Sequence, residues 1–183
     1  MTNIITILKE KTHSKRGEDL IELLNDWGEK TGERFVRKHG VLPPSNKYFA
    51  VVEVWVRLSR SKLLLVQRHP NKDFGNQWEC PGGTVRITET PSIAVRRELF
   101  EETGIRAPKR KLVPLGVTKH NNWFCHSFLL DLDEPDVKIK LQERETVAYK
   151  FVGVDETEEF IGNLTEGHRE TFLKYRGRIA SVD

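Results

Sequence analysis

The stretch GGTVRITETPSIAVRRELFEETGI, residues 82–105, combines helix start and stop signals with a cluster of glutamates. Thr90 suits the N-cap of a helix, and a proline such as Pro91 is tolerated at the first helical position. Gly104 suits the left-handed residue that ends a helix. The pattern therefore predicts a helix over Pro91–Thr103.

Three glutamates, Glu98, Glu101 and Glu102, stand at the unfavourable end of this helix. A helix C-terminus carries partial negative charge, and like charges three or four residues apart repel by roughly 0.2–0.5 kcal/mol per pair. At about 100° per residue the three share one face with the small Ala94. A solvated acidic face and a site for divalent cations are both consistent with the helix alone. The apolar residues that flank this face are expected to pack on the core: Ile93, Val95, Leu99 and Phe100.

Composition limits the number of domains and the class of partner that we expect. The 183 residues, 37% of them hydrophobic, fit a single globular domain. A net charge of +3 is too balanced for a dedicated nucleic-acid or membrane-surface binder, so we expect a small-molecule partner. Two cysteines, Cys80 and Cys125, do not form a disulfide framework, and no segment is apolar enough to span a membrane. The N-terminal apolar run is too short for a signal peptide, and a cytoplasmic location is expected.

Strand patterns dominate the rest of the chain. Residues 21–38 predict a β-hairpin that turns around 28–32, with a short helix over 18–25 as the alternative. Residues 49–56 are apolar on both faces, as in a buried central strand, and are expected to pair with Lys62–Arg68. Further strands are expected at 111–118, Trp123–Leu132, 136–140 and 146–154.

Two more helices are expected near the C-terminus. Asp155 and Glu158 have the spacing of a capping box, and Thr165 suits the N-cap of a last helix that buries Phe172 and Leu173. Strands in this number with two or three helices predict an α/β or α+β sandwich around a mixed sheet. We expect residues 1–45 to form an extension and hairpin packed on a domain of residues 46–183.

The spacing within residues 83–105 decides between the two interpretations of the acidic helix. It resembles the Nudix box of the Nudix hydrolases, and a chance match in a chain of this length is on the order of one in a million. The resemblance implies the Nudix α/β/α sandwich. It also implies Mg²⁺-dependent, MutT-like pyrophosphohydrolase activity on a small, nucleotide-linked diphosphate, with Mn²⁺ able to replace Mg²⁺. Nine positions carry it: Gly83, Glu89, Arg97, Glu98, Leu99, Glu101, Glu102, Gly104 and Ile105.

The resemblance also implies a role for each box residue. Glu98, Glu101 and Glu102 match the metal-binding acids, and Gly83 matches the residue that offers a backbone carbonyl to the metal. Glu89 and Arg97 match a structural pair between loop and helix, while Thr88 departs from the usual glycine. The general base is expected among Glu102, Glu98 and a later loop glutamate. Glu145 suits that last role, with Glu143 close behind, although a solvated loop charge explains either equally well.

Arg68, Lys72 and Trp78, ahead of the box, resemble the isopentenyl-diphosphate-isomerase-like branch of the family. In that arrangement Arg68 and Lys72 would clamp substrate phosphates. Isomerisation is therefore an alternative function, but the isomerase cysteine position is Gly82 here and Cys80 falls two residues early. Hydrolysis is favoured.

A non-catalytic nucleotide-binding sensor is a third hypothesis, and residues 21–38 suggest a homodimer by exchange. His120 and His126 lack paired metal-ligand spacing, and Trp78 is expected to pack below the loop rather than stack on RNA.

Overall fold

A computed structural model describes residues 19–38, 41–133 and 137–181. Its elements begin and end as follows: β1 (Asp19–Leu24), β2 (Lys30–Arg37), β3 (Phe49–Leu58), β4 (Lys62–Arg68), β5 (Trp78–Glu79), β6 (Gly82–Thr84), α1 (Pro91–Thr103), the 3-10 helix η1 (Lys109–Lys111), β7 (Leu112–Lys119), β8 (Trp123–Leu132), β9 (Thr146–Gly153), α2 (Thr157–Phe160), the 3-10 helix η2 (Ile161–Asn163) and α3 (Glu166–Ile179).

The central sheet is mixed, and it divides between β3 and β4 where β5 and β6 enter it. β3 pairs in parallel with β8 along its whole length, β8 pairs antiparallel with β7, and β4 pairs antiparallel with β9. β3 and β4 pair only beside their shared turn, at Arg57 with Leu63 and Leu58 with Lys62. Beyond that point β6 pairs with β3 and β5 pairs with β4. The chain that leads into α1 therefore leaves from the interior of the sheet.

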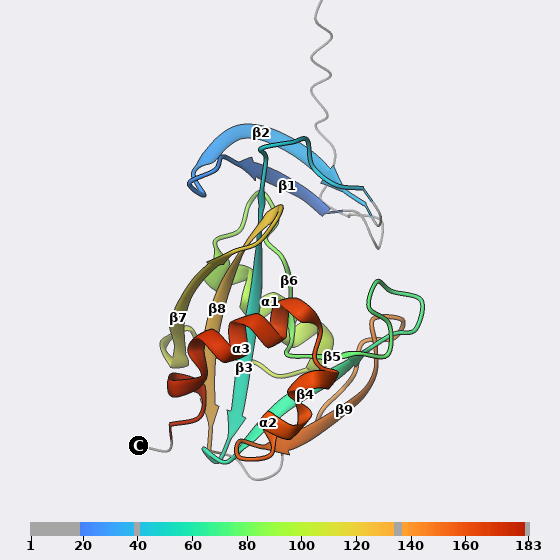
Figure 1. Ribbon diagram of the computed structural model, residues 1–183, viewed down its shortest axis with the longest axis vertical. Coiled ribbons are helices and arrows are strands. Elements are labelled where there is room, and N and C mark those ends of the chain that lie inside the picture. The colour runs from blue at the N-terminus through green and yellow to red at the C-terminus, as the bar shows by residue number, and fades with distance from the viewer. Residues whose placement is uncertain (1–18, 39–40, 134–136, 182–183) are drawn as a thin grey trace, which may run out of the picture.

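Helices cover both faces of this sheet, as the sequence predicts. α1 lies behind the sheet in Figure 1, and α3 with α2 lies in front of it. Because strand side chains alternate, Val54 of β3 joins the core under α1, whereas Trp55 packs on Phe172 of α3 with ring centroids 5.3 Å apart. Within the described ranges, no helix is long and apolar enough to cross a membrane.

The N-terminal hairpin is confirmed and the alternative helix is wrong. β1 and β2 form their own two-stranded sheet at one end of the molecule (Figure 1). Ile21 and Leu23 pack on Phe49. The turn is residues 25–29, where the Asn25 Oδ1 accepts two backbone N–H groups, so it lies earlier than predicted. A local Asx-type turn forms there because the asparagine side chain satisfies the turn's own donors.

Residues 136–140 were expected to form a strand, and their described part, 137–140, does not. The backbone N–H of Lys140 donates to Thr103 O at 2.9 Å, and that of Gln142 donates to Glu102 O at 3.3 Å. Val137 and Ile139 pack on the core under α1. The last carbonyls of a helix have no intrahelical donors, and here this segment supplies them.

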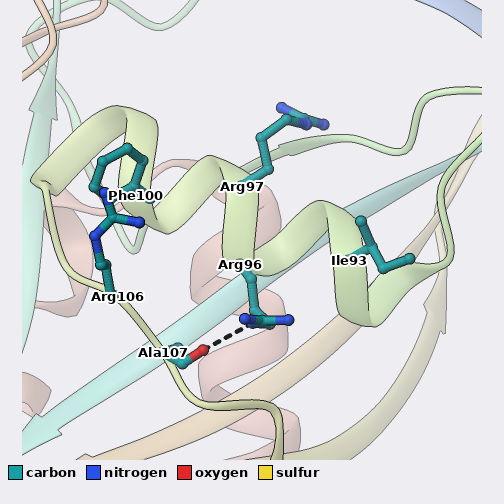
Figure 2. Close-up of a pocket in the computed structure, with 6 residues that line it drawn as sticks. All are labelled: Ile93, Arg96, Arg97, Phe100, Arg106 and Ala107. Atoms are coloured by element: carbon teal, nitrogen blue, oxygen red, sulfur yellow. Dashed lines mark hydrogen bonds between the residues drawn. The ribbon is translucent and has the colours of Figure 1, made fainter.

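Other local expectations are corrected by the packing. Ile93 and Phe100 are 49% and 40% exposed, because α1 buries only its Ala94, Val95 and Leu99 side. Figure 2 shows Phe100 under the guanidinium of Arg106, 4.1 Å from its ring centroid. On α3, Phe172 is buried as predicted, but Leu173 is exposed. The N-cap of α2 is Glu156, so the capping box expected at Asp155 is wrong.

Candidate functional site

The acidic face of α1 lies directly against the glycine strand β6. A methyl group added at Gly83 would meet the Glu98 Oε1 at 2.3 Å, so the carboxylate takes its place against this backbone only while residue 83 has no side chain. The backbone N–H of Gly82 donates to the Glu102 Oε2 at 3.2 Å. Because β6 is hydrogen-bonded to β3, both carboxylates are held against the interior of the sheet.

Arg97 joins the loop to the helix. Its Nε donates to Glu89 Oε1 at 2.6 Å, and its Nη2 donates to Glu89 Oε2 at 2.8 Å and to Thr84 O at 2.9 Å. Its Nη1 lies 2.6 Å from Glu98 Oε1 and 3.2 Å from Glu101 Oε2. A bidentate guanidinium–carboxylate pair fixes orientation as well as distance, so these contacts hold the loop against α1.

Burial disfavours the charged forms of Glu98 and Glu102. It raises the pKa of Glu98 to about 7, although Arg97 opposes the change. Burial also raises the pKa of Glu102 well above its usual range, and the charges of Glu79 and Glu98 add to this effect. Neighbouring carboxylates that repel each other in a buried place are stabilised as anions by a cation between them.

The donor set fits a hard divalent cation. Carboxylate oxygens and a backbone carbonyl are the ligands that Mg²⁺ prefers, and this ion usually keeps several waters. Glu101 is more exposed and turns toward Arg97 and Arg86. Among the described residues, the one trio of ligand-type side chains whose donor atoms lie within 4.8 Å of one another is Glu53, Cys80 and His168, not the three box acids. The box acids therefore suit a hydrated ion rather than a compact protein cage.

The two cations expected to bind phosphate both have acidic partners. Arg68 Nη1 donates to both carboxylate oxygens of Glu79, at 2.8 and 2.6 Å, and Lys72 forms an ion pair with Glu145. Lys72 also counteracts the rise of the Glu102 pKa, so it lies near the acidic face.

Glu79 lies beside the candidate site, and no pattern in the sequence predicts it there. It is 6% exposed and lies close enough to Glu102 to raise the pKa of that carboxyl. A glutamate inside a buried strand just ahead of ProGlyGly was the available signal.

The loop that carries Glu145 is anchored to both sides of the site. The backbone oxygen of Glu145 accepts from His69 N–H at 3.0 Å, and the backbone N–H of Glu145 donates to Gln142 O at 3.3 Å. Gln142 in turn caps Glu102 O. The fold thus brings Glu145 and Lys72 to the C-terminal end of α1, while Glu143 is exposed on the same loop.

The aromatic and histidine side chains take other places. His120 Nδ1 lies 3.1 Å from Glu170 Oε2, and its ring stacks on Trp123. Burial lowers the pKa of His126. Trp78 packs edge-on against Phe160, as expected for a residue below the loop. An open pocket of about 320 Å³ lies on the outer face of α1, where Figure 2 shows Arg96 bonded to Ala107 O, rather than over the acids.

Comparison with known proteins agrees with this geometry. An RNA pyrophosphohydrolase of Bartonella bacilliformis is 28% identical over 116 residues, which are 62% of this chain and 61% of that protein. This chain thus spans less than two thirds of that relative. A solved structure from Deinococcus radiodurans has a TM-score of 0.70 at 20% identity, covering 86% of this chain and 99% of its own.

A bifunctional NMN adenylyltransferase/ADP ribose pyrophosphatase of Francisella tularensis, complexed with AMP and a manganese ion, has a TM-score of 0.63 at 22% identity. The match covers 76% of this chain and 43% of that one. These two likenesses show the shared fold. The model of the NUDIX domain matches residues 47–175, more than half of the chain. With the box spacing, the sandwich and this match together, the chain belongs to the NUDIX domain family.

Proposed function

We propose that this protein is a hydrolase that cleaves a diphosphate bond in a small, nucleotide-linked molecule with the help of Mg²⁺. One observation carries the proposal: Glu102 is buried, the side chain of Glu98 is only 12% exposed, and both carboxylates lie against the glycine backbone at Gly82 and Gly83. Such a pair of acids is unfavourable without a cation, and a diphosphate substrate brings cations with it.

In this proposal Glu98, Glu101, Glu102 and the carbonyl of Gly83 hold the ion, and Mn²⁺ can take its place. When bound, the ion neutralises the diphosphate charge and lowers the pKa of a coordinated water. Arg97 and Glu89 are positioning residues that keep the loop on α1. Their bidentate contact supports this role, because it joins the loop to the helix that carries all three acids.

The chain offers its own groups for the proton and the phosphates. We place Glu145 as the general base that accepts the proton of the attacking water, with Glu102 and Glu98 as the other two options. The ion pair of Glu145 with Lys72 supports this, because substrate phosphates can draw the ammonium away and leave the carboxylate free. In the proposal Arg68 is the second side chain that contacts a substrate phosphate. It does so after giving up one of its two hydrogen bonds to Glu79.

The substrate class comes from the relative's name. The Bartonella protein is named an RNA pyrophosphohydrolase, which supports a nucleotide-linked diphosphate for this chain. Isomerisation lacks comparable support, because the Cys80 thiol is buried in the core on the α3 face of the sheet.

We further propose that residues 1–45 form an extension packed on a catalytic domain of residues 46–183. The family match begins at residue 47, and β1 and β2 form a separate sheet, which supports that boundary. A cytoplasmic location is supported by two free, buried cysteines. The proposed homodimer is tested by a light-scattering mass.

The test is a substrate panel in ¹⁸O-labelled water with and without Mg²⁺: ADP-ribose, nucleoside triphosphates, dinucleoside polyphosphates, 5′-triphosphorylated RNA and isopentenyl diphosphate. We expect ¹⁸O in a released phosphate product, with turnover lost in Glu102→Gln. Glu145→Gln should lower kcat by about 10²–10⁴-fold, as loss of a general base does, while the exposed Glu143→Gln should not. Binding without turnover would favour the sensor, and double-bond migration without phosphate release would favour the isomerase.

A further inference from the structure

A second group of metal-type ligands lies on the sheet face opposite α1. It consists of Glu53 on β3, Cys80 directly after β5, and His168 in the first turn of α3, and their ligand atoms lie within 4.8 Å of one another. Cys80 belongs to the core cluster that contains Trp55 and Phe172, on the α3 side of the sheet. The group is therefore distinct from the acids of α1.

The carboxylate of Glu53 is held in one orientation by neutral donors. Ser127 Oγ and Trp55 Nε1 donate to its Oε1 at 2.7 and 3.2 Å, and Thr171 Oγ1 donates to its Oε2 at 3.1 Å. Metal-ligating carboxylates are commonly oriented by outer hydrogen bonds of this kind.

His168 is oriented in the same way. Its Nδ1 lies 2.6 Å from the Thr165 hydroxyl and 3.9 Å from Glu79 Oε2. Its Nε2 lies 3.7 Å from Glu53 Oε2, beyond hydrogen-bond distance. One ring nitrogen fixed by an outer partner and the other aimed at a cluster of acceptors is the usual arrangement of a ligating histidine.

This group is short of positive charge. Glu53 is 2% exposed, and within the described part of the chain no lysine or arginine nitrogen lies within 4 Å of its carboxylate. Glu79, in contrast, forms an ion pair with Arg68. The Cys80 thiol is also buried and has no hydrogen bond from any described residue. A buried carboxylate without a cation costs several kcal/mol, on the order of magnitude known for unpaired buried ions.

We propose that Glu53, Cys80 and His168 bind a zinc ion. A thiolate with an imidazole selects zinc over Mg²⁺, which prefers oxygen ligands alone. Zinc with one thiolate and one carboxylate is electrically neutral, and binding releases the thiol proton to water. With bonds of about 2.0–2.3 Å, ligand atoms in a tetrahedral zinc site lie roughly 3.3–3.8 Å apart, so the three side chains close in slightly. Water fills the fourth position.

The ion would connect three separate elements. It joins α3 to β3 and to the end of β5, which continues through Pro81 into the glycine strand β6. Its role is therefore structural, and it does not depend on the proposed hydrolase activity. The thiol of Cys125 lies close to Glu53, so Cys125 is unsuitable as a control.

The experiment measures metal in the full chain, purified under reducing conditions without a histidine tag. We expect one zinc ion per chain by mass spectrometry, lost in Cys80→Ser and in His168→Gln but retained in the matched control His126→Gln. After exchange with Co²⁺, the wild type should show a thiolate-to-cobalt charge-transfer band that Cys80→Ser lacks. Chelation should lower the Tm of the wild type and of His126→Gln, and leave that of Cys80→Ser unchanged.

Circular dichroism establishes that each variant is folded. The proposal is overturned if folded wild type, incubated with equimolar Zn²⁺ or Co²⁺ and desalted, retains no metal. It is also overturned if the cobalt bands are identical in the wild type and Cys80→Ser, or if Glu98→Gln rather than Cys80→Ser removes them, since the ion would then occupy the acids of α1.

Discussion

The carboxylate of Glu98 meets two opposite influences. Burial against Gly83 disfavours its charge, while Arg97 at 2.6 Å favours it, and burial prevails because its pKa rises to about 7. A side chain in this balance responds strongly to a nearby cation. We expect this response in stability as well as in activity.

Metal-free protein should lose stability as the pH rises from the ordinary pKa of a glutamate to the raised pKa of Glu98. The folded pKa is about 7 and the ordinary value is 4.5, so between these values the folded state binds more protons than the unfolded state. The free energy of unfolding therefore falls with rising pH in this window. Glu98→Gln, measured by urea titration, should gain stability relative to wild type between about pH 5 and pH 8, by at most about 3 kcal/mol.

The exposed Glu159→Gln serves as its control and should show no such trend. Mg²⁺ added at the upper pH should stabilise wild type more than Glu98→Gln. A difference between wild type and Glu98→Gln that stays constant at every pH would contradict the assigned environment.

Alanine substitutions at the adjacent Gly82 and Gly83 should have different effects on stability and metal binding. A methyl group at Gly82 would lie 2.3 Å from the backbone oxygen of Val52, whereas one at Gly83 would meet only the end of the Glu98 side chain. Gly82→Ala should destabilise the fold by about 1–3 kcal/mol, as overpacking does. Gly83→Ala should change the denaturation midpoint little and weaken Mn²⁺ binding in calorimetric titration. Equal effects of both substitutions on stability would show that the Glu98 side chain cannot yield.

At the scale of elements, the end of α1 is built by two segments. Gly104 has φ 76° and donates its N–H to Phe100 O, and residues 140–142 cap the carbonyls of Thr103 and Glu102. The acids of the last turn are thereby kept helical although their charges oppose the helix dipole. The loop that ends in Glu145 is positioned by the same contacts.

Gly104→Ala should destabilise the protein by about 1–2 kcal/mol, because a residue with a side chain is strained at this φ. Thermal denaturation with Gly162→Ala as the control tests this, since a methyl group at Gly162 would meet nothing within 4 Å. If the two variants melt alike, the left-handed geometry at Gly104 is not needed to end α1.

At the scale of the whole molecule, Arg57 joins the sheet to the end of the chain. It is 4% exposed, and it donates to Asp131 through Nε at 2.6 Å and Nη2 at 2.9 Å. Its Nη1 donates to the carbonyls of Ile179, the last residue of α3, and of Ser181. One side chain therefore holds β3, β8 and α3 together at the end of β3 that leads into the β3–β4 turn.

Arg57→Lys should lower the free energy of unfolding by about 3 kcal/mol, because an ammonium cannot make the bidentate pair and also reach both carbonyls. Urea titration measures this, with Arg60→Lys in the exposed β3–β4 turn as the control. A loss no larger than that of the control would mean that α3 docks through its apolar face alone.

The sequence alone determined the elements whose pattern is local. The helix Pro91–Thr103, its N-cap Thr90 and its terminal Gly104 were predictable because capping and the 3.6-residue period depend on neighbours in the chain. The hairpin, the long strands and the family box follow from patterns of the same kind. The spacing of Glu98, Glu101 and Glu102 likewise predicts that all three lie on one face of the helix.

Only the tertiary structure decided which charges meet. Glu79 beside Glu102, Arg68 on Glu79, and Glu53 with Cys80 and His168 join residues far apart in the chain, so no periodicity announces them. The tertiary structure also exposed Ile93, Phe100 and Leu173, because a helix buries only the side that its partner covers. Residues 137–140 do not form a strand, because the open carbonyls at the end of α1 accept the N–H groups of Lys140 and Gln142.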